Sequence, residues 1–126
     1  MTDATHATDI WNRAADHLAD GVPADAREGD RRLAAALSLD GQVQANGLAQ
    51  ALESGDVAPA VDAFRWFGLD DVAGLLEEAA AALGDDPDGE RDEELSGRYY
   101  ALDTETRLTE GLERRLRTDP EAFLPL

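Results

Sequence analysis

The sequence predicts an all-α fold, a compact single-domain bundle of about six to seven short helices. Apolar residues recur at intervals of three and four along most of the chain, which is the period of a helix with one buried face. No segment shows the strict alternation of a half-buried strand. The composition is rich in Ala, Leu, Glu and Arg, which favour helix intrinsically. At 126 residues the chain has the size of one ordinary domain, so we treat residues 1–126 as a single unit.

The first predicted helix lies around residues 9–18. At about 100° per residue, its apolar side gathers Ile10, Trp11, Ala14 and Leu18. The opposite side carries a row of acidic residues: Asp9, Asp16 and Asp20. Gly21 and Pro23 follow directly, and they end the helix because glycine suits a helix stop and proline cannot continue one.

A second helix is predicted from Arg31 to Leu39, where apolar side chains again have helical spacing. Gly41 and Gly47 then bracket a short polar stretch, in which we expect a kinked or broken helix. A short helix follows and runs through Leu52.

Two helices are predicted in the middle of the chain. Residues 54–56 form a turn in which Asp56 caps the next helix, and Pro59 is tolerated in its first turn. An apolar stripe in this helix stops at Gly68. Asp70 and Asp71 open the following helix, since carboxylates stabilise a helix N-terminus, and Gly84 closes it.

The C-terminal part begins with residues 85–94, whose composition predicts a mobile acidic connector. A helix marked by Leu95, Tyr99 and Leu102 follows, and Asp103 or Thr104 caps a last long helix. A final turn at residues 119–121 docks Phe123 and Leu124. The few large anchors of the predicted core are Trp11, Phe64, Trp66, Phe67, Tyr99, Tyr100 and Phe123.

Cysteine is absent, so disulfides and thiolate metal sites are excluded. No stretch approaches the roughly 18 apolar residues that span a bilayer, and the polar N-terminus lacks the features of a signal peptide. We therefore expect a cytoplasmic protein that has no membrane contact.

Charge is the strongest compositional signal. Twenty-eight acidic residues face eleven basic ones, all Arg, for a formal net charge of −17. Such a field repels nucleic acid and anionic membranes and attracts basic partners. Two explanations stay open: the acidity is functional, or it reflects the composition of the source genome and the solubility demands of its habitat.

The charge is unevenly distributed along the chain. Residues 1–30 carry seven acids and two Arg, and residues 31–84 carry eight and three, so each segment has a net charge of −5. Residues 85–103 carry eight acids and two Arg, a net −6 within nineteen residues, whereas residues 104–126 carry five and four. The acidity therefore lies away from the last helix.

The sequence contains few residue patterns that are typical of catalytic sites. His6 and His17 are too far apart along a helix to share a metal, and no phosphate-binding loop, serine elbow or zinc-protease spacing occurs. The adjacent pairs Glu77–Glu78 and Glu93–Glu94 point about 100° apart on a helix, so neither pair needs to share a site. We expect a protein that is not an enzyme and needs no metal or cofactor.

One stretch, Val43 to Leu52, resembles the hallmark of the DNA mimic protein (DMP) family, bacterial helical domains long catalogued as of unknown function. That hallmark runs approximately Val, Asn, Asn, Gly, Gly, Phe, any residue, Gln and two aromatic residues. Val43, Gly47 and Gln50 match it. Leucines replace aromatics at Leu48 and Leu52, and Gln44, Ala45, Asn46 and Ala51 depart from it.

The order of the surrounding elements also resembles that family, over about residues 30–124. Phe67-Gly68 precedes an alanine-rich helix and an acidic break, and Tyr99-Tyr100-Ala101-Leu102 precedes a leucine-rich helix and a Pro-Glu-Ala-Phe ending. The resemblance implies an all-helical fold and a homodimer whose acidic surface imitates DNA and occupies a helix-turn-helix transcription regulator. Gly47 and Gln50 look structural: the glycine permits a turn or a close approach, and the glutamine can satisfy backbone groups at a broken helix.

Our hypothesis from the sequence is an acidic protein-binding module that presents carboxylates to the basic face of a DNA-binding protein or transcription regulator. The contacts expected first are Asp85, Asp86, Asp88, Asp92, Glu93 and Glu94, with Asp9, Asp16 and Asp20 second. The chain itself would not bind nucleic acid. Two alternatives remain: a generic interaction or immunity-type protein whose acidity is only surface solvation, favoured by an exposed apolar patch, and a small carboxylate-based enzyme, favoured by buried, convergent acids.

Overall fold

The structure is a computed structural model that describes residues 3–54, 57–82 and 90–123, with the side chains of residues 3–6 and 54 left aside. These residues form seven α-helices and a 3₁₀ helix, and they contain no strand, which confirms the all-α prediction. The helices are α1 (Asp3–Asp20), α2 (Glu28–Asn46), α3 (Leu48–Ser54), α4 (Val57–Trp66), α5 (Asp70–Ala82), α6 (Glu90–Ala101) and α7 (Thr104–Thr118), followed by the 3₁₀ helix η2 (Pro120–Ala122).

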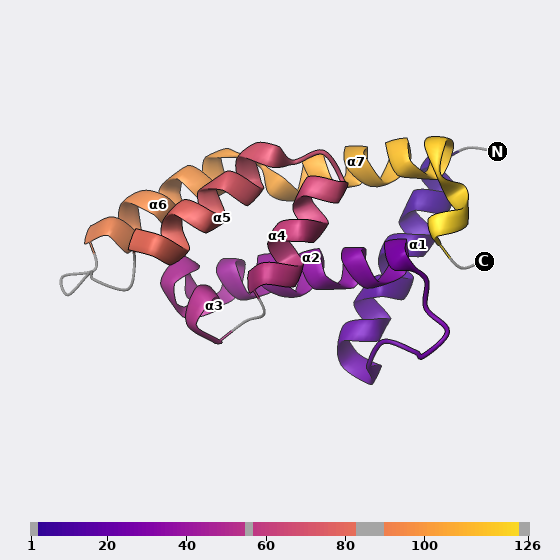
Figure 1. The fold of residues 1–126 in the computed structure, drawn as a ribbon, viewed down its shortest axis with the longest axis horizontal. Helices are drawn as coiled ribbons and strands as arrows, with labels where there is room; N and C mark the ends of the chain where they lie inside the picture. The colour runs from indigo at the N-terminus through magenta and orange to yellow at the C-terminus, as the bar shows by residue number, and fades with distance from the viewer. Residues whose placement is uncertain (1–2, 55–56, 83–89, 124–126) are drawn as a thin grey trace.

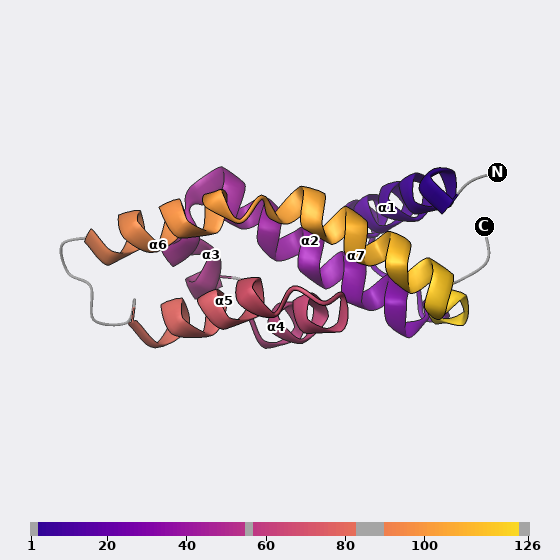
Figure 2. The ribbon, with the colours of Figure 1, turned by 90° about the horizontal axis from the view of Figure 1, so that it is seen from above.

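The bundle is elongated, and α2 runs along its long axis (Figure 1). Helices α6 and α7 follow each other end to end along the same axis on the opposite side (Figures 1 and 2). Helix α4 covers one flank of α2, and α5 packs against α4, α3 and α6. Helix α1 covers the other flank of α2 and contacts α7 as well. The beginning of α6 therefore lies at one end of the molecule, and α1 lies in the opposite half, with its N-terminal end farthest from α6 (Figure 1).

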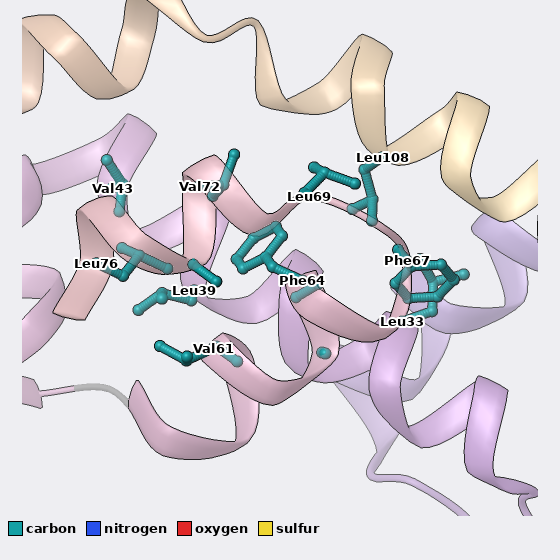
Figure 3. Packing of buried hydrophobic residues seen from close by; sticks show 14 of the residues in the cluster. Leu33, Leu39, Val43, Val61, Phe64, Phe67, Leu69, Val72, Leu76 and Leu108 are labelled. Carbon is teal, nitrogen blue, oxygen red and sulfur yellow. The ribbon is translucent and has the colours of Figure 1, made fainter.

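The core is formed where α4 and α5 meet α2 and α7. Phe64 lies at its centre, with Val72 and Leu69 beside it (Figure 3), and all three are shielded from solvent. Other buried members of this cluster are Leu33, Leu39, Val43, Leu76, Leu108 and Leu112. Burial of these apolar surfaces is the main force that holds the seven short helices together.

The break expected between Gly41 and Gly47 occurs only at Gly47. Helix α2 continues through Gly41, which is exposed. A glycine inside a helix costs about 1 kcal/mol relative to alanine. Leu39 and Val43 on either side are 2% and 0% exposed, so their packing offsets this cost and keeps the helix intact. The predicted α2 was therefore too short at its C-terminal end.

Helix α6 begins at Glu90, inside the stretch predicted to be a connector. Its first turn carries three acidic residues, which interact favourably with the positive end of the helix dipole. The acidic composition that suggested a loop is thus compatible with a helix start. Asp103 precedes α7 as expected, but it adopts a left-handed conformation (φ 52°) and its side chain makes no capping hydrogen bond.

One predicted core anchor, Tyr100, and one residue of the predicted apolar side of α1, Leu18, lie partly outside the core. Tyr100 is 47% exposed, and its hydroxyl donates to the carbonyl of Val43 at 3.1 Å. Leu18 is also 47% exposed, although its azimuth on α1 is the expected one. The C-terminal end of α1 projects past α2 (Figure 1), in keeping with the exposure of Leu18.

Phe123 docks as predicted, whereas Leu124 lies outside the described residues, and a glycine allows the close approach of Phe123. Phe123 is 2% exposed and its ring lies 5.9 Å from that of Trp66. A side chain at Gly29 would meet the Phe123 ring at 2.7 Å. Likewise, a Cβ at Gly111 of α7 would come within 2.5 Å of the carbonyl oxygen of Phe67, so only glycine lets α7 cross the α4–α5 turn this closely.

Candidate functional site

The acidic row on α1 is placed as the sequence predicted. Asp9, Asp16 and Asp20 are all exposed, on the side opposite the buried Ile10 and Ala14. None of the three forms an ion pair with another described residue. Three carboxylates therefore face solvent along one edge of α1, the helix in the half of the molecule where the N-terminus lies (Figure 1).

A second set of free carboxylates occupies the start of α6, at the opposite end. Glu90, Glu93 and Glu94 are exposed and likewise form no ion pair with other described residues. Glu93 and Glu94 were predicted contacts, and Glu90 was not singled out. The other predicted contacts of this stretch, Asp85, Asp86 and Asp88, lie outside the described residues.

Asp92 points the other way and has an internal role. Its Oδ1 accepts hydrogen bonds from the backbone N–H of Ala49 at 2.8 Å and from the Ser96 hydroxyl at 3.2 Å. The Ser96 oxygen in turn accepts the backbone N–H of Leu48 at 3.1 Å. Asp92 and Ser96 thus cap the beginning of α3 from a different helix, and they hold α6 against the α2–α3 junction.

The reason for this remote cap is the conformation of Gly47. Its φ of 88° and ψ of 167° fall in a region that residues with a side chain rarely adopt. A residue at this position normally caps the following helix with its own side-chain oxygen, and glycine has none. Side chains of α6 therefore satisfy the backbone amides of Leu48 and Ala49 at the broken helix, and the side chain of Gln50 is exposed.

Sequence reasoning missed this arrangement because it assigned Asp92 to a loop. The available signal was the spacing: Asp92 and Ser96 are four residues apart, which places both on one face of a helix. Tyr99 continues that face, since its hydroxyl donates to Asp40 of α2 at 2.7 Å. Burial, together with the Asp40 carboxylate, raises the pKa of the Tyr99 hydroxyl well above its ordinary value, so it stays a donor.

The arginines neutralise a different part of the surface. Five ion pairs occur among the described residues: Arg13–Asp30, Arg32–Glu28, Arg65–Glu77, Arg98–Glu78 and Arg107–Asp71. Three of them involve acids of α5. The Arg107 guanidinium makes two hydrogen bonds of 2.7 Å to Asp71 and lowers the pKa of that carboxyl.

Two arginines of α7 are used in packing. Arg115 donates to the Trp66 carbonyl at 2.8 and 2.6 Å, and its guanidinium lies 4.0 Å from the indole centroid. Arg114 donates to the carbonyl of Phe67 at 3.4 Å. Arginines of α4, α6 and α7 thus pair with α5 or pack on the end of α4, whereas the exposed carboxylates of α1 and of the α6 start form no ion pair with other described residues.

Asp30 is the acidic residue that lies deepest, at 2% exposed. Arg13 donates to one of its oxygens at 2.8 Å, and the backbone N–H of Arg27 donates to the other at 3.1 Å. The contact fastens α1 to the first turn of α2. It is a structural pair, since both oxygens of the carboxylate are engaged within the bundle.

The described residues contain no group of three or more His, Cys, Asp or Glu side chains that could hold a metal ion. Of the two histidines, His17 is half-buried in the last turn of α1, and the side chain of His6 lies outside the described residues. Within the same part of the chain, every helix is too short or too polar to cross a membrane.

Comparison with known proteins gives one match. The family described as DMP19-like protein matches residues 24–124, which is most of the chain and includes α2 through η2. No curated protein and no solved structure matches the chain. The matched segment contains the α6 carboxylates and the Gly47 junction, and it leaves out α1 with its acidic row.

Proposed function

This chain belongs to the DMP19-like protein family, and from that premise we propose that it is a DNA mimic, an acidic protein that occupies the DNA-contacting face of a basic DNA-binding protein. A transcription regulator is the kind of partner that such a module would serve. Carboxylates take the place of phosphates, and each pairs with an Arg or Lys side chain that otherwise contacts DNA.

The observation that carries this proposal is the arrangement of like charges on the two outer helix faces. Asp16 and Asp20 on α1, and Glu90 and Glu94 on α6, are each separated by four residues, which sets their side chains about 5–6 Å apart. Like charges at this spacing destabilise a helix by a few tenths of a kcal/mol. Within the described residues none of these four acids forms an ion pair with an arginine, although arginines pair with acids elsewhere on the surface.

The spacing suits a polyanion mimic. Duplex DNA carries one phosphate charge per about 1.7 Å of axis, and proteins that bind it present rows of basic side chains. Rows of free carboxylates on rigid helices attract the same side chains, and they repel DNA itself. This competition needs no contact between the chain and nucleic acid.

We extend the proposal to a cytoplasmic homodimer, as the family resemblance suggests. A twofold arrangement would present each acidic face twice, which suits a DNA-binding protein that is itself a dimer. Light scattering after gel filtration measures the mass directly: two chains support the dimer, and one chain of 13.5 kDa contradicts it.

A generic interaction protein is the second candidate, and one observation favours it. Leu18 and Val22 are 47% and 38% exposed, and both lie near the end of α1. Two exposed apolar side chains are a small patch compared with those that mark most docking sites. A catalytic function has less support, because the buried carboxylate of Asp30 is paired with Arg13, so we propose that the chain is not an enzyme.

The test is capture of partners by the immobilised protein from lysate of its source cell. We expect recovery of one basic DNA-binding protein, which is released by high salt and by competing duplex DNA, since screening shortens to a few ångströms in concentrated salt. A partner that resists both salt and DNA would contradict mimicry and favour the generic interaction protein.

A further inference from the structure

Helix α4 presents an exposed outer edge of small apolar residues. A groove of about 630 Å³ lies between α4 and α2, and Ala35, Ala58 and Pro59 give it an apolar lining. A second groove, of about 560 Å³, lies on the α5 side of α4 and shares Ala58 and Asp62 with the first. The exposed edge of α4 is therefore a ridge between two grooves.

The charges around the two grooves cancel, although the chain as a whole has a net charge of −17. The groove walls carry six charged residues, three of each sign: Glu28, Asp62 and Glu77, and Arg31, Arg32 and Arg65. Two copies of so acidic a chain repel each other least where the local charge is zero. This face is therefore the one that favours contact with a second copy.

Two of these six charges have no opposite charge bound to them. Two of the arginines are paired with acids of the same chain. The other two charges of the α2–α4 groove, Asp62 on α4 and Arg31 on α2, form no ion pair with another described residue. Arg31 donates from Nε and Nη2 to three carbonyl oxygens of the α1–α2 connection, at 3.1 to 3.2 Å. These bonds hold its guanidinium in place and leave the two N–H groups of Nη1 for a carboxylate.

We propose that two copies of this chain join through the α4 edge, with the α4 ridge of each copy in the α2–α4 groove of the other; this inference rests on the homodimer proposed above and names its contact surface. In a twofold contact, each residue that meets a second residue is met by it in return. Asp62 of each copy then pairs with the partner subunit's Arg31, so both charges gain an opposite charge. The small side chains of Ala35, Ala58 and Pro59 let the helices pack closely, since the distance between helix axes depends on the side chains at the contact.

Contact at α4 leaves the acidic faces free. Helix α1, with its row of carboxylates, lies on the opposite flank of α2 (Figure 2). The exposed carboxylates of α6 lie at one end of the molecule (Figure 1). A dimer joined at α4 therefore presents each set of carboxylates twice on its outer surface.

The first experiment exchanges the two charges between copies. Asp62→Arg sets an arginine against the partner subunit's Arg31, and Arg31→Glu sets a glutamate against the partner subunit's Asp62, twice in each dimer. Each variant alone should dimerise about tenfold more weakly than the unchanged protein, by sedimentation equilibrium. An equimolar mixture should form a heterodimer about as tight as the unchanged dimer, because both pairs of opposite charge are restored, and native mass spectrometry identifies it.

The second experiment places a charge on the apolar ridge. Ala58→Glu should weaken the dimer on the order of a hundredfold, since two carboxylates per dimer would lose water in the grooves. Ala15→Glu is the matched control, because Ala15 is an exposed alanine of α1 and the substitution adds the same charge. It should leave the dissociation constant unchanged, and circular dichroism checks that every variant is folded.

The proposals fail separately. If the unchanged protein is a dimer but Ala58→Glu and Ala15→Glu weaken it equally, or the mixture of folded charge variants forms no heterodimer, the α4 surface is wrong and the homodimer stands. If the unchanged protein is a monomer, both the surface and the homodimer are wrong. In either case, capture of a basic DNA-binding protein that duplex DNA releases would still support the DNA-mimic function.

Discussion

The two acidic ends of the molecule are built in different ways. At one end, Asp9, Asp16 and Asp20 lie on α1, a helix outside the family-matched segment that is fastened by its apolar stripe and by the Arg13–Asp30 pair. At the other end, the carboxylates of α6 lie on a helix that is hydrogen-bonded to α2 and α3 through Asp92, Ser96 and both tyrosines. The two helices present the same number of exposed carboxylates, but α6 is held by more hydrogen bonds than α1. Binding that needs a fixed array of charges should therefore depend more on α6.

The largest expected effect concerns the fastening of α1. Arg13→Ala leaves the Asp30 carboxylate buried without its cation, which should lower the free energy of unfolding by about 3 kcal/mol. Urea denaturation measures the loss, and hydrogen exchange should show α1 opening before α6. Arg65→Ala, which breaks an exposed pair with Glu77, is the control and should change the free energy of unfolding far less. Equal losses in the two variants would remove the contrast between buried and exposed pairs.

The next effect concerns the hydrogen bonds by which Asp92 attaches α6 to the start of α3. Asp92→Ala removes the cap of α3 and should cost about 2 kcal/mol in the same urea experiment. Asp92→Asn keeps an oxygen that accepts from Ala49, so it should retain at least half of that stability. Glu93→Ala, one position along the same helix but exposed, should change little. If Glu93→Ala destabilised as much as Asp92→Ala, the inward role of Asp92 would be refuted.

The affinity for the partner protein can be measured in variants that lack the carboxylates of α6 or those of α1, which compares the two acidic ends directly. Changing Glu90, Glu93 and Glu94 to Gln should weaken binding of the captured DNA-binding protein about tenfold, since each exposed charge pair contributes about 0.5 kcal/mol. Changing Asp9, Asp16 and Asp20 to Asn removes the same charge and should weaken it about threefold, because the end of α1 projects beyond its neighbours (Figure 1). Titration calorimetry at two salt concentrations checks both values. A larger loss from the α1 variant would reverse the assignment.

The smallest effect is a pH dependence on the neutralised side of the bundle. Arg107 lowers the pKa of Asp71 below its ordinary value of about 3.9, so the pair stabilises the fold above that pH and the contribution is lost as pH falls through the lowered pKa. Arg107→Ala should therefore cost about 0.5–1 kcal/mol at pH 7, and this cost should shrink as the pH falls through the lowered pKa of Asp71. Thermal unfolding across this range measures the difference, and a cost independent of pH would show that Arg107 acts through packing alone.

Most helices could be predicted from the sequence because their signals are local. The stop after Asp20, the start at Asp70 and the final turn that buries Phe123 were all expected and are present. The errors occurred where a local signal was outweighed. Gly41 predicted a break, but the fully buried Val43 and its neighbours hold α2 straight through it.

The candidate site was only partly predictable. The exposed row on α1 follows from helical periodicity alone, and so does the exposure of Glu93 and Glu94 once α6 is known to begin at Glu90. The inward turn of Asp92 does not, because composition cannot distinguish a carboxylate that caps a distant helix from one that faces solvent.

The sequence by itself determined the helical class, the order of the elements and the net charge, since these depend on residue types and on intervals of three and four. The tertiary structure alone decided which acids are free, which are paired and which serve as caps. Periodicity sets the direction of a side chain around its own helix, whereas its partners depend on what the rest of the chain places there. Leu18 has the azimuth of a core residue but no neighbouring helix, and Asp92 has the composition of a loop and the position of a cap.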